Sequence, residues 1–166
     1  MSEQLKAEIA ALVPRLRRFA YAISGSREEG DDLVQTACVK ALSRIDQYRP
    51  GTRLDSWMFR IVQNTHIDAM RSRKRFQGSS DPEVLERLSD EGREADRNEH
   101  RLLLAKARSA IAALPEQQRA VIALVASEGY SYKEAAAILD TPVGTVMSRL
   151  NRARASLLPL MAETAP

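Results

Sequence analysis

The stretch SYKEAAAILDTPVGTVMSRLNRARASL, from Ser131 to Leu157, decides the fold of the second half of this chain. Ser131 is a favourable N-cap residue, and Glu134 three positions later completes the capping-box pattern that marks the start of a helix. The alanines that follow allow a close approach by another helix, and Asp140 ends the run. Because Pro142 fits the first position of a second helix, the stretch predicts a helix-turn-helix corner.

The second helix, for which Thr141 is the expected N-cap, separates an apolar stripe from a polar face. The stripe follows the spacing i, i+3, i+7, i+10 and i+14 and consists of Val143, Val146, Leu150, Ala153 and Leu157. The opposite, exposed side holds Ser148, Asn151 and Arg152, flanked by Thr145, Met147 and Arg149. In a major groove arginine reads guanine and asparagine reads adenine, so this face predicts DNA recognition. The alternative is a solvated helix whose arginines keep the domain soluble.

The remaining sequence is also dominated by helical patterns. Alanine, leucine, arginine and glutamate, the strong helix formers, are abundant, whereas the chain holds only 7 glycines and few aromatic residues. Apolar residues recur at helical spacing between residues 5 and 76, with breaks expected at Pro14, at Gly25–Ser26 and in the loop Tyr48–Thr52. We therefore predict an all-α fold.

Composition divides these helices into two small domains. Residues 1–76 are expected to form the first domain, and residues 100–166 the second, which ends in the helix-turn-helix. Residues 77–99 are rich in aspartate and glutamate and hold few large apolar side chains. Such a segment buries little surface and suits an acidic, flexible linker.

Basic residues also gather at the end of the first domain. The net charge is only +3, but a sequence pI of about 9.2 permits binding to a polyanion. The run Arg71–Arg75 closes a helix whose exposed side is expected to hold Arg60, Gln63, Asn64, His66 and Asp68. Cations are favourable at any helix C-terminus, which is the purely structural alternative. The two basic segments, one in each domain and joined by the linker, indicate a protein that binds two separate parts of one nucleic acid.

No constellation in the sequence indicates catalysis, a cofactor or a metal. Cys38 is the only cysteine, which excludes an internal disulfide and predicts a buried small residue. His66 and His100 are expected to be ordinary surface histidines. No phosphate-binding loop, carboxylate pair or activated nucleophile predicts an enzyme or a small-molecule substrate. The sequence has no apolar run near the roughly 20 residues that cross a bilayer, and no signal-peptide pattern, so a cytoplasmic protein without membrane insertion is expected.

The segment Asp31-Asp32-Leu33-Val34-Gln35 is expected to begin a helix of the first domain. Two acids in a first turn are favourable against the helix dipole, which suffices to explain them. The exposed acids and glutamine are equally suited to dock a basic helix of a partner protein.

Together these segments resemble the extracytoplasmic-function (ECF) sigma factors of bacterial RNA polymerase, within the sigma-70 family. Asp31–Gln35 resembles the polymerase-binding segment of the family's region 2. Trp57–Thr65, followed by Asp68 and Arg71, resembles the stretch that melts the promoter and recognises the −10 element. The segments Tyr132–Ala136 and Val143–Arg149 resemble the helix-turn-helix of region 4. The match covers nearly the whole chain in the family's order.

The resemblance implies a transcription initiation factor that guides core RNA polymerase to promoters. Docking on the β′ clamp helices would use Asp31, Asp32, Leu33 and Gln35. The −10 element would be held by Tyr48, Arg49, Thr52 and Arg53, from a loop that captures a flipped base, and by Asn64, Asp68, Arg71, Arg73, Lys74 and Arg75. The −35 element would be read by Thr145, Met147, Ser148, Arg149, Asn151 and Arg152. The second domain would also bind the β-flap, and an anti-sigma partner would hold the factor inactive.

Two other functions remain compatible with the sequence. A stand-alone helix-turn-helix regulator, whose first half senses a signal or dimerises, would bind its operator without polymerase. A sigma-like decoy would bind an anti-sigma protein and never touch DNA, but the arginines at Arg149, Arg152 and Arg71–Arg75 argue against it.

Overall fold

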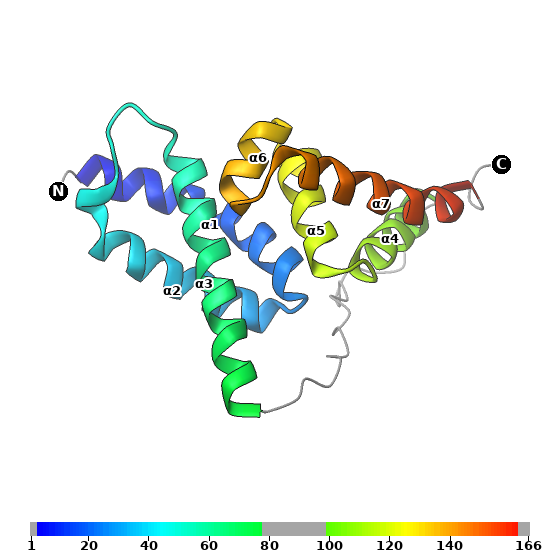
Figure 1. Cartoon of the computed structure of the whole chain (residues 1–166), viewed down its shortest axis with the longest axis horizontal. Coiled ribbons are helices and arrows are strands. Elements are labelled where there is room, and N and C mark those ends of the chain that lie inside the picture. The colour runs from blue at the N-terminus through cyan, green and yellow to red at the C-terminus, as the bar shows by residue number, and fades with distance from the viewer. Residues whose placement is uncertain (1–2, 78–98, 163–166) are drawn as a thin grey trace.

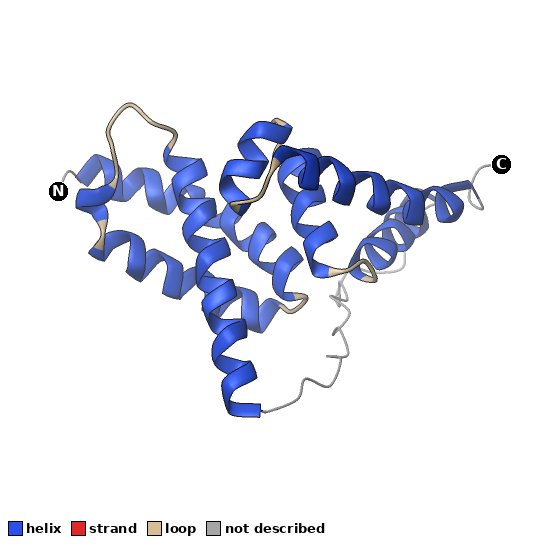
Figure 2. Ribbon diagram, viewed as in Figure 1, coloured by secondary structure: helices blue, strands red, loops and turns tan. Residues whose placement is uncertain are grey.

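A computed structural model describes residues 3–77 and 99–162, and all regular elements in these ranges are helices (Figure 2). The first range holds α1 (Glu3–Ser24), α2 (Arg27–Ser43), the 3-10 turn η1 (Ile45–Gln47) and α3 (Leu54–Gln77). The second holds α4 (Glu99–Ala112), α5 (Glu116–Ile122), the π-helical segment η2 (Ala123–Ser127), α6 (Tyr132–Leu139) and α7 (Val143–Ala162). The all-α prediction is confirmed. Nearly all of the expected acidic linker lies outside the described residues.

Pro14 lies inside α1, so the prediction that it ends or opens a helix is wrong. A proline in a helix interior costs roughly 3 kcal/mol because it removes a backbone hydrogen bond and crowds the preceding turn. On either side of Pro14, however, α1 buries Ile9, Leu16, Phe19 and Ile23. Each large apolar side chain contributes about 1.5–3 kcal/mol when it is buried. Packing of this face therefore outweighs the local preference of the proline.

The corner between α1 and α2 forms at the break that the sequence predicts. Gly25 has a φ of 74°, a conformation that favours glycine, and Ser26 is the N-cap of α2. The Ser26 hydroxyl accepts a hydrogen bond of 3.3 Å from the backbone N–H of Glu29. Because α2 starts directly after Ser26, Asp31 and Asp32 lie beyond its first turn. The prediction that these two acids begin the helix is therefore wrong.

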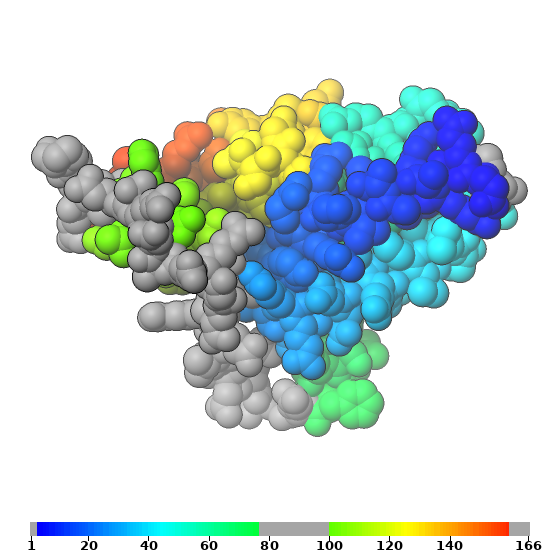
Figure 3. Space-filling view, turned by 180° about the vertical axis from the view of Figure 1, so that it is seen from behind, coloured from blue at the N-terminus to red at the C-terminus, as the bar shows by residue number. Residues whose placement is uncertain are grey.

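One buried core runs through both groups of helices. α1 packs on α5 and α3 packs on α6 (Figure 1), and from behind the surface of α1 adjoins that of α5 (Figure 3). At the centre of this contact lies Phe59 of α3, which is fully buried. Its ring meets Phe19 and Tyr130 edge to face, with centroids 5.3 and 5.7 Å away. The two groups of helices therefore share one apolar interior.

A buried arginine joins α5 to the end of α1. Arg119 is only 5% exposed. Its guanidinium donates hydrogen bonds of 2.6 Å to the carbonyl oxygens of Ala22 and Leu114, and one of 3.4 Å to that of Ile23. The last carbonyls of a helix lack partners within the helix and carry partial negative charge, so a cation satisfies them. Arg119 thereby closes the C-terminal end of α1 from the other half of the protein.

The π-helical segment η2 widens the end of α5 by one residue. The backbone N–H of Glu128 donates to the carbonyl of Ala123, five residues earlier, over 3.0 Å. The Glu128 side chain is only 7% exposed and accepts a hydrogen bond of 2.8 Å from the Arg15 Nε of α1. The segment therefore places a carboxylate against α1.

We expect Phe59→Ala to lower the free energy of unfolding by about 3–5 kcal/mol, because it removes a ring from a packed interior. Urea unfolding followed by circular dichroism measures the change. Phe76→Ala is the matched control, since the Phe76 side chain is 88% exposed and its loss should cost less than about 0.5 kcal/mol. An equal cost for the two variants would contradict a shared core centred on Phe59.

Candidate nucleic-acid interface

The capping box predicted at the start of α6 is confirmed. The Ser131 hydroxyl accepts from the Glu134 backbone N–H, and the Glu134 carboxylate accepts from the Ser131 backbone N–H, each over 3.0 Å. Asp140 ends α6 in the left-handed conformation, with φ of 51° and ψ of 50°, and its N–H contacts the carbonyls of Ala136 and Ala137. These local contacts set the tight turn into α7.

The start of α7 differs from the prediction in two ways. Thr141 does not cap the helix, because its buried hydroxyl has no hydrogen-bond partner among the described residues. The carbonyl of Pro142 instead accepts from the backbone N–H groups of Thr145 and Val146, at 3.0 and 3.3 Å. Val143, expected on the buried stripe, is 40% exposed because the stripe begins to pack only at Val146.

The polar face of α7 lies where helical spacing places it, on the side opposite the buried stripe. The exposed members are Met147, Ser148, Asn151 and Arg152, and the half-buried members are Thr145 and Arg149. Val146, Leu150 and Ala153 are buried on the opposite side. The face therefore offers an amide and a guanidinium to a ligand while the core fixes the rotation of the helix.

The second basic group lies at the free end of α3. Arg71, Lys74 and Arg75 are exposed, as is Asn64, which lies about two to three turns earlier. Arg73 is half-buried. These cations belong to the last turns of a helix and would meet an approaching phosphate backbone with several donors at once.

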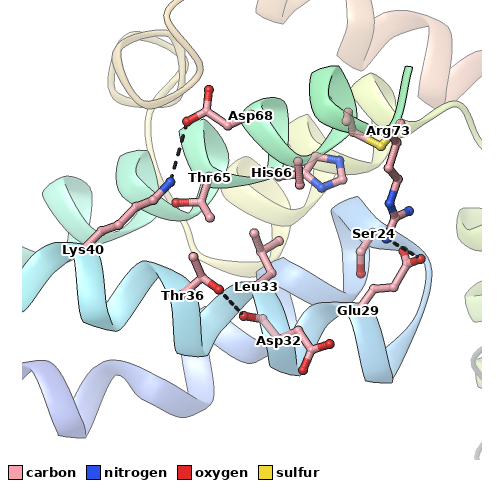
Figure 4. A pocket seen from close by; sticks show the side chains of 12 residues that line it. Ser24, Glu29, Asp32, Leu33, Thr36, Lys40, Thr65, His66, Asp68 and Arg73 are labelled. Carbon is pink, nitrogen blue, oxygen red and sulfur yellow. Dashed lines mark hydrogen bonds and ion pairs between the residues drawn. The ribbon is translucent and has the colours of Figure 1, made fainter. Parts of the chain in front are cut away.

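Two ion pairs tie this end of α3 to α2 around a pocket of about 350 Å³. Arg73 meets Glu29 at 2.9 Å, and Lys40 meets Asp68 at 3.6 Å (Figure 4). Both Arg73 and Asp68 are predicted DNA contacts, so α2 holds two of these side chains in place. The Asp32 side chain lines the same pocket.

His66 is buried, and its predicted place on the surface is wrong. Its Nε2 lies 2.5 Å from a carboxylate oxygen of Glu116, at the start of α5. No local sequence pattern indicates this contact, because the two residues are 50 positions apart. Gln63, also expected on the exposed side, is only partly exposed. Cys38 is half-buried against the core, and this burial raises the pKa of its thiol.

The loop between η1 and α3 is closed by its own side chains. The Tyr48 hydroxyl donates to the carbonyl of Thr52 over 2.8 Å, and the Thr52 hydroxyl donates to the carbonyl of Arg49 over 2.7 Å. The Tyr48 ring packs on that of Trp57, with centroids 5.4 Å apart. Arg49 and Thr52 remain exposed at the tip, so a preformed loop presents them to solvent.

Arg53, the fourth predicted residue of this loop, contacts the other half of the protein. Its guanidinium donates to both oxygens of Asp55, at 3.2 and 2.9 Å. It also pairs with Glu134 of α6 and lies over the ring of Tyr130, 4.8 Å from the centroid. Asp55, Tyr130 and Glu134 were missed by sequence reasoning, since no local pattern connects α6 with the loop.

A network of polar groups surrounds the Tyr130 hydroxyl. Burial, and then its hydrogen bond to Asp55, raises the pKa of Tyr130 to about 12. Burial alone would raise the pKa of Asp55, but hydrogen bonds from Arg53 and Tyr130 hold it below its usual value. Arg15 adds a contact of 3.4 Å to Asp55. At neutral pH Arg15, Arg53 and Asp55 are therefore charged, and the Tyr130 hydroxyl that they surround is neutral.

We expect Tyr130 to titrate later than an ordinary tyrosine. A folded-state pKa raised from 10.0 to about 12 contributes stability that is fully present below pH 10 and lost as the pH rises through 12. Phenolate absorbance should show a step near pH 12 that vanishes in Tyr130→Phe and persists in Tyr132→Phe. Stability of Tyr130→Phe should also vary less between pH 10 and 12. If the step near pH 12 were lost in Tyr132→Phe, its assignment to Tyr130 would be wrong.

The acidic segment of α2 presents a mixed surface. Asp32 and Gln35 are exposed, whereas Leu33 is buried and supports the helix from within. Asp31 accepts a hydrogen bond of 2.6 Å from the Tyr21 hydroxyl. Val39, 67% exposed, continues the face at helical spacing from Gln35. Sequence analysis missed this last residue, although the spacing of three to four positions could have found it.

Other exposed apolar side chains lie on α4 and α7, two helices that contact one another. They are Leu102, Leu103, Leu104 and Leu158, which are exposed by between 38% and 69%.

Within residues 3–77 and 99–162, no helix is both long enough and apolar enough to cross a membrane. The same residues contain no group of histidine, cysteine or acidic side chains that could hold a metal ion.

Comparison with known proteins assigns both halves of the chain. The model of sigma-70 region 2 matches residues 9–76, and that of sigma-70 region 4 matches residues 104–157. Both groups of helices therefore belong to the sigma-70 class of proteins.

Individual relatives show to which group of sigma-70 proteins the chain belongs. The ECF RNA polymerase sigma factor EcfG of Rhodopseudomonas palustris is 38% identical over 162 residues, covering 97% of this chain and 87% of the relative. The ECF RNA polymerase sigma-E factor of Escherichia coli is 35% identical over 158 residues, covering 90% and 78%. The sigma factor RpoE of Bartonella quintana, solved in complex with the anti-sigma factor NepR, is 31% identical with a TM-score of 0.77, covering 97% of this chain and 98% of that one. The chain belongs to the ECF sigma factors of RNA polymerase.

Proposed function

We propose that this protein binds core RNA polymerase and directs it to promoters by contacting a −10 and a −35 element. The observation that carries the proposal is the exposed polar face of α7, held by a capped helix-turn-helix in a chain of the ECF sigma family. On the other group of helices, the loop tip at Arg49 and Thr52 and the basic run Arg71–Arg75 supply DNA-facing groups at the two ends of α3. DNA-facing groups on both halves of the chain suit two separate promoter elements.

The polymerase-binding surface in this proposal is the outer face of α2. Asp32 and Gln35 provide polar contacts to the β′ clamp helices, and exposed Val39 adds apolar area. The leucines of α4 and α7 offer a second surface, suited to the β-flap. The site of action would be the cytoplasm, where the polymerase works.

We further propose that an anti-sigma partner regulates the chain. The Bartonella quintana relative of similar fold was solved with such a partner. An anti-sigma protein would compete with the polymerase for the exposed apolar residues, because both partners need the same surface.

Run-off transcription with purified core polymerase and a library of promoter fragments tests the proposal. Initiation that depends on this protein and occurs at defined sites is the expected result. Operator binding by the protein alone, without an effect on core polymerase, would favour a stand-alone regulator. Core binding without initiation would favour the decoy.

Replacing the exposed polar residues of α2, Asp32→Ala with Gln35→Ala, should weaken core binding by about tenfold, as loss of hydrogen-bonded contacts worth about 1.4 kcal/mol in total does. Fluorescence titration with labelled core polymerase measures the affinity, and circular dichroism checks the fold. Glu8→Ala, at an exposed position of α1, is the control for loss of an acid elsewhere. Unchanged core affinity in the double variant would remove α2 from the polymerase interface.

Arg152→Ala should weaken promoter binding of the holoenzyme by roughly 5- to 150-fold, since a bidentate arginine–base contact is worth about 1–3 kcal/mol. The effect should disappear on a promoter whose −35 element is scrambled. Arg154→Ala makes the same charge change on another side of α7, and Arg154 is likewise exposed. Equal losses from the two variants, on both promoters, would indicate general electrostatic attraction and not recognition by Arg152.

A further inference from the structure

Two apolar side chains are exposed beside the polar face of α7. Val143 is 40% exposed and Met147 is 45% exposed. They lie one helical turn apart, and Asn151 follows Met147 at the same spacing of four residues. Side chains at this spacing point within about 40° of one another and lie about 6 Å apart along the helix. The three side chains therefore form one ridge, which is apolar at the start of α7 and polar one turn further on.

The core of the protein does not account for the two apolar side chains. Val146, Leu150 and Ala153 make the packing contacts of this part of α7 and are at most 4% exposed. Among the described residues, neither Val143 nor Met147 belongs to the buried core or to the partly buried side chains packed against it. Their apolar surface is therefore open to a ligand, and its burial on binding would be favourable.

Gly144 is a second observation at the same place. Beyond its chain neighbours and the backbone of its own helix, a Cβ atom at this position would meet no atom of the described residues within 4 Å. Its φ is not positive, so neither packing nor backbone conformation requires glycine here. Glycine is less favourable than alanine in a helix, and it is typical where a ligand approaches the backbone closely. The start of α7 therefore suits a ligand that comes close to the ridge.

The ridge matches the groups that A·T base pairs present in a major groove. Adenine offers an acceptor and a donor that one asparagine amide satisfies together, and thymine offers its C5 methyl group to apolar side chains. Base pairs are about 3.4 Å apart, so the spacing of about 6 Å between Met147 and Asn151 corresponds to about two base pairs. One ridge can therefore contact an adenine and a nearby thymine.

The charge around the ridge favours DNA over another protein as the partner. α7 carries Arg149, Arg152 and Arg154 and holds no acidic residue. Interfaces with DNA are much more positively charged than interfaces between proteins. Cations on the same helix would hold the phosphate backbone while the ridge faces the base edges.

We propose that Met147, with Val143 beside it, recognises the methyl group of a thymine in the −35 element, close to an adenine bound by Asn151. The proposal rests on the proposed function for the docking of α7 in the major groove, and it adds which bases this part of the helix selects. The unbranched, flexible side chain of Met147 fits around a methyl group. Gly144 leaves room for the backbone of α7 to approach the bases.

Exchange of thymine for uracil tests the methyl contact, because it removes the C5 methyl group and keeps base pairing. Each thymine of the −35 element is replaced singly in a promoter on which the holoenzyme initiates, and fluorescence titration measures holoenzyme binding. At one or two positions the exchange should weaken binding by about fourfold, as expected for loss of one buried methyl group. Thymines of the spacer are the matched control. A −35 element without thymine in either strand, or one indifferent to every exchange, would overturn the proposal.

Two variants of Met147 assign the effect to this side chain. Met147→Ala shortens the side chain, whereas Met147→Leu keeps an apolar group of similar volume. At a sensitive position Met147→Ala should bind the thymine and uracil promoters equally well, and Met147→Leu should retain most of the difference. Because Met147 is exposed, both variants should fold as the parent does, which circular dichroism checks. A methyl effect that persists at every position in Met147→Ala would overturn the proposal.

Gly144→Ala tests the close approach of the backbone. The free protein should keep or gain thermal stability, because alanine is the better helix former. Binding of the holoenzyme should weaken by about as much as for one mismatched base pair, roughly 5- to 150-fold. Unchanged promoter affinity would contradict the close approach and overturn the proposal.

The outcomes for this contact and for the proposed function are distinguishable. A holoenzyme that binds no promoter would contradict the proposed function and the methyl contact with it. Specific initiation from a −35 element whose thymine methyl groups have no effect would overturn the methyl contact alone and leave the proposed function standing.

Discussion

The edge-to-face contact of Phe59 with Tyr130 is the interaction on which the rest of the arrangement depends. It joins α3 to Tyr130, which follows η2, and the charged residues meet around this phenol, whose residue is only 3% exposed. Without this apolar centre, Arg15, Arg53 and Glu128 would be isolated surface charges, each pair worth less than about 1 kcal/mol. The charged residues add specificity to a contact whose driving force is the burial of rings.

The same arrangement treats the two sets of predicted DNA contacts differently. The predicted −35 contacts lie on the side of α7 opposite the buried residues Val146, Leu150 and Ala153. The loop before α3 is different, because Arg49 and Thr52 are exposed whereas Arg53 pairs with Glu134 of α6. Under the proposed function, one guanidinium of the −10 contacts is therefore already occupied by a carboxylate of the protein.

Local chemistry made much of the structure predictable. Ser131 with Glu134, and the breaks at Gly25–Ser26 and Tyr48–Thr52, are short-range signals that fold as expected. Pro14 was misread because packing of α1 outweighs a local penalty, and His66 because its partner Glu116 is distant in sequence. The exposed positions of α7 followed from periodicity alone. No sequence pattern reveals contacts between the two groups of helices, since each half has a complete helical signature of its own.

The π-helical segment at Ala123–Ser127 determines which side chain after it faces α1. Its hydrogen bonds join residues five positions apart, so a turn of this kind holds about one residue more than an α-helical turn. Each residue advances a helix by about 100°. In a regular α-helical turn the residues after Ala123 would point about 100° from their present direction, and Glu128 would no longer face Arg15 of α1.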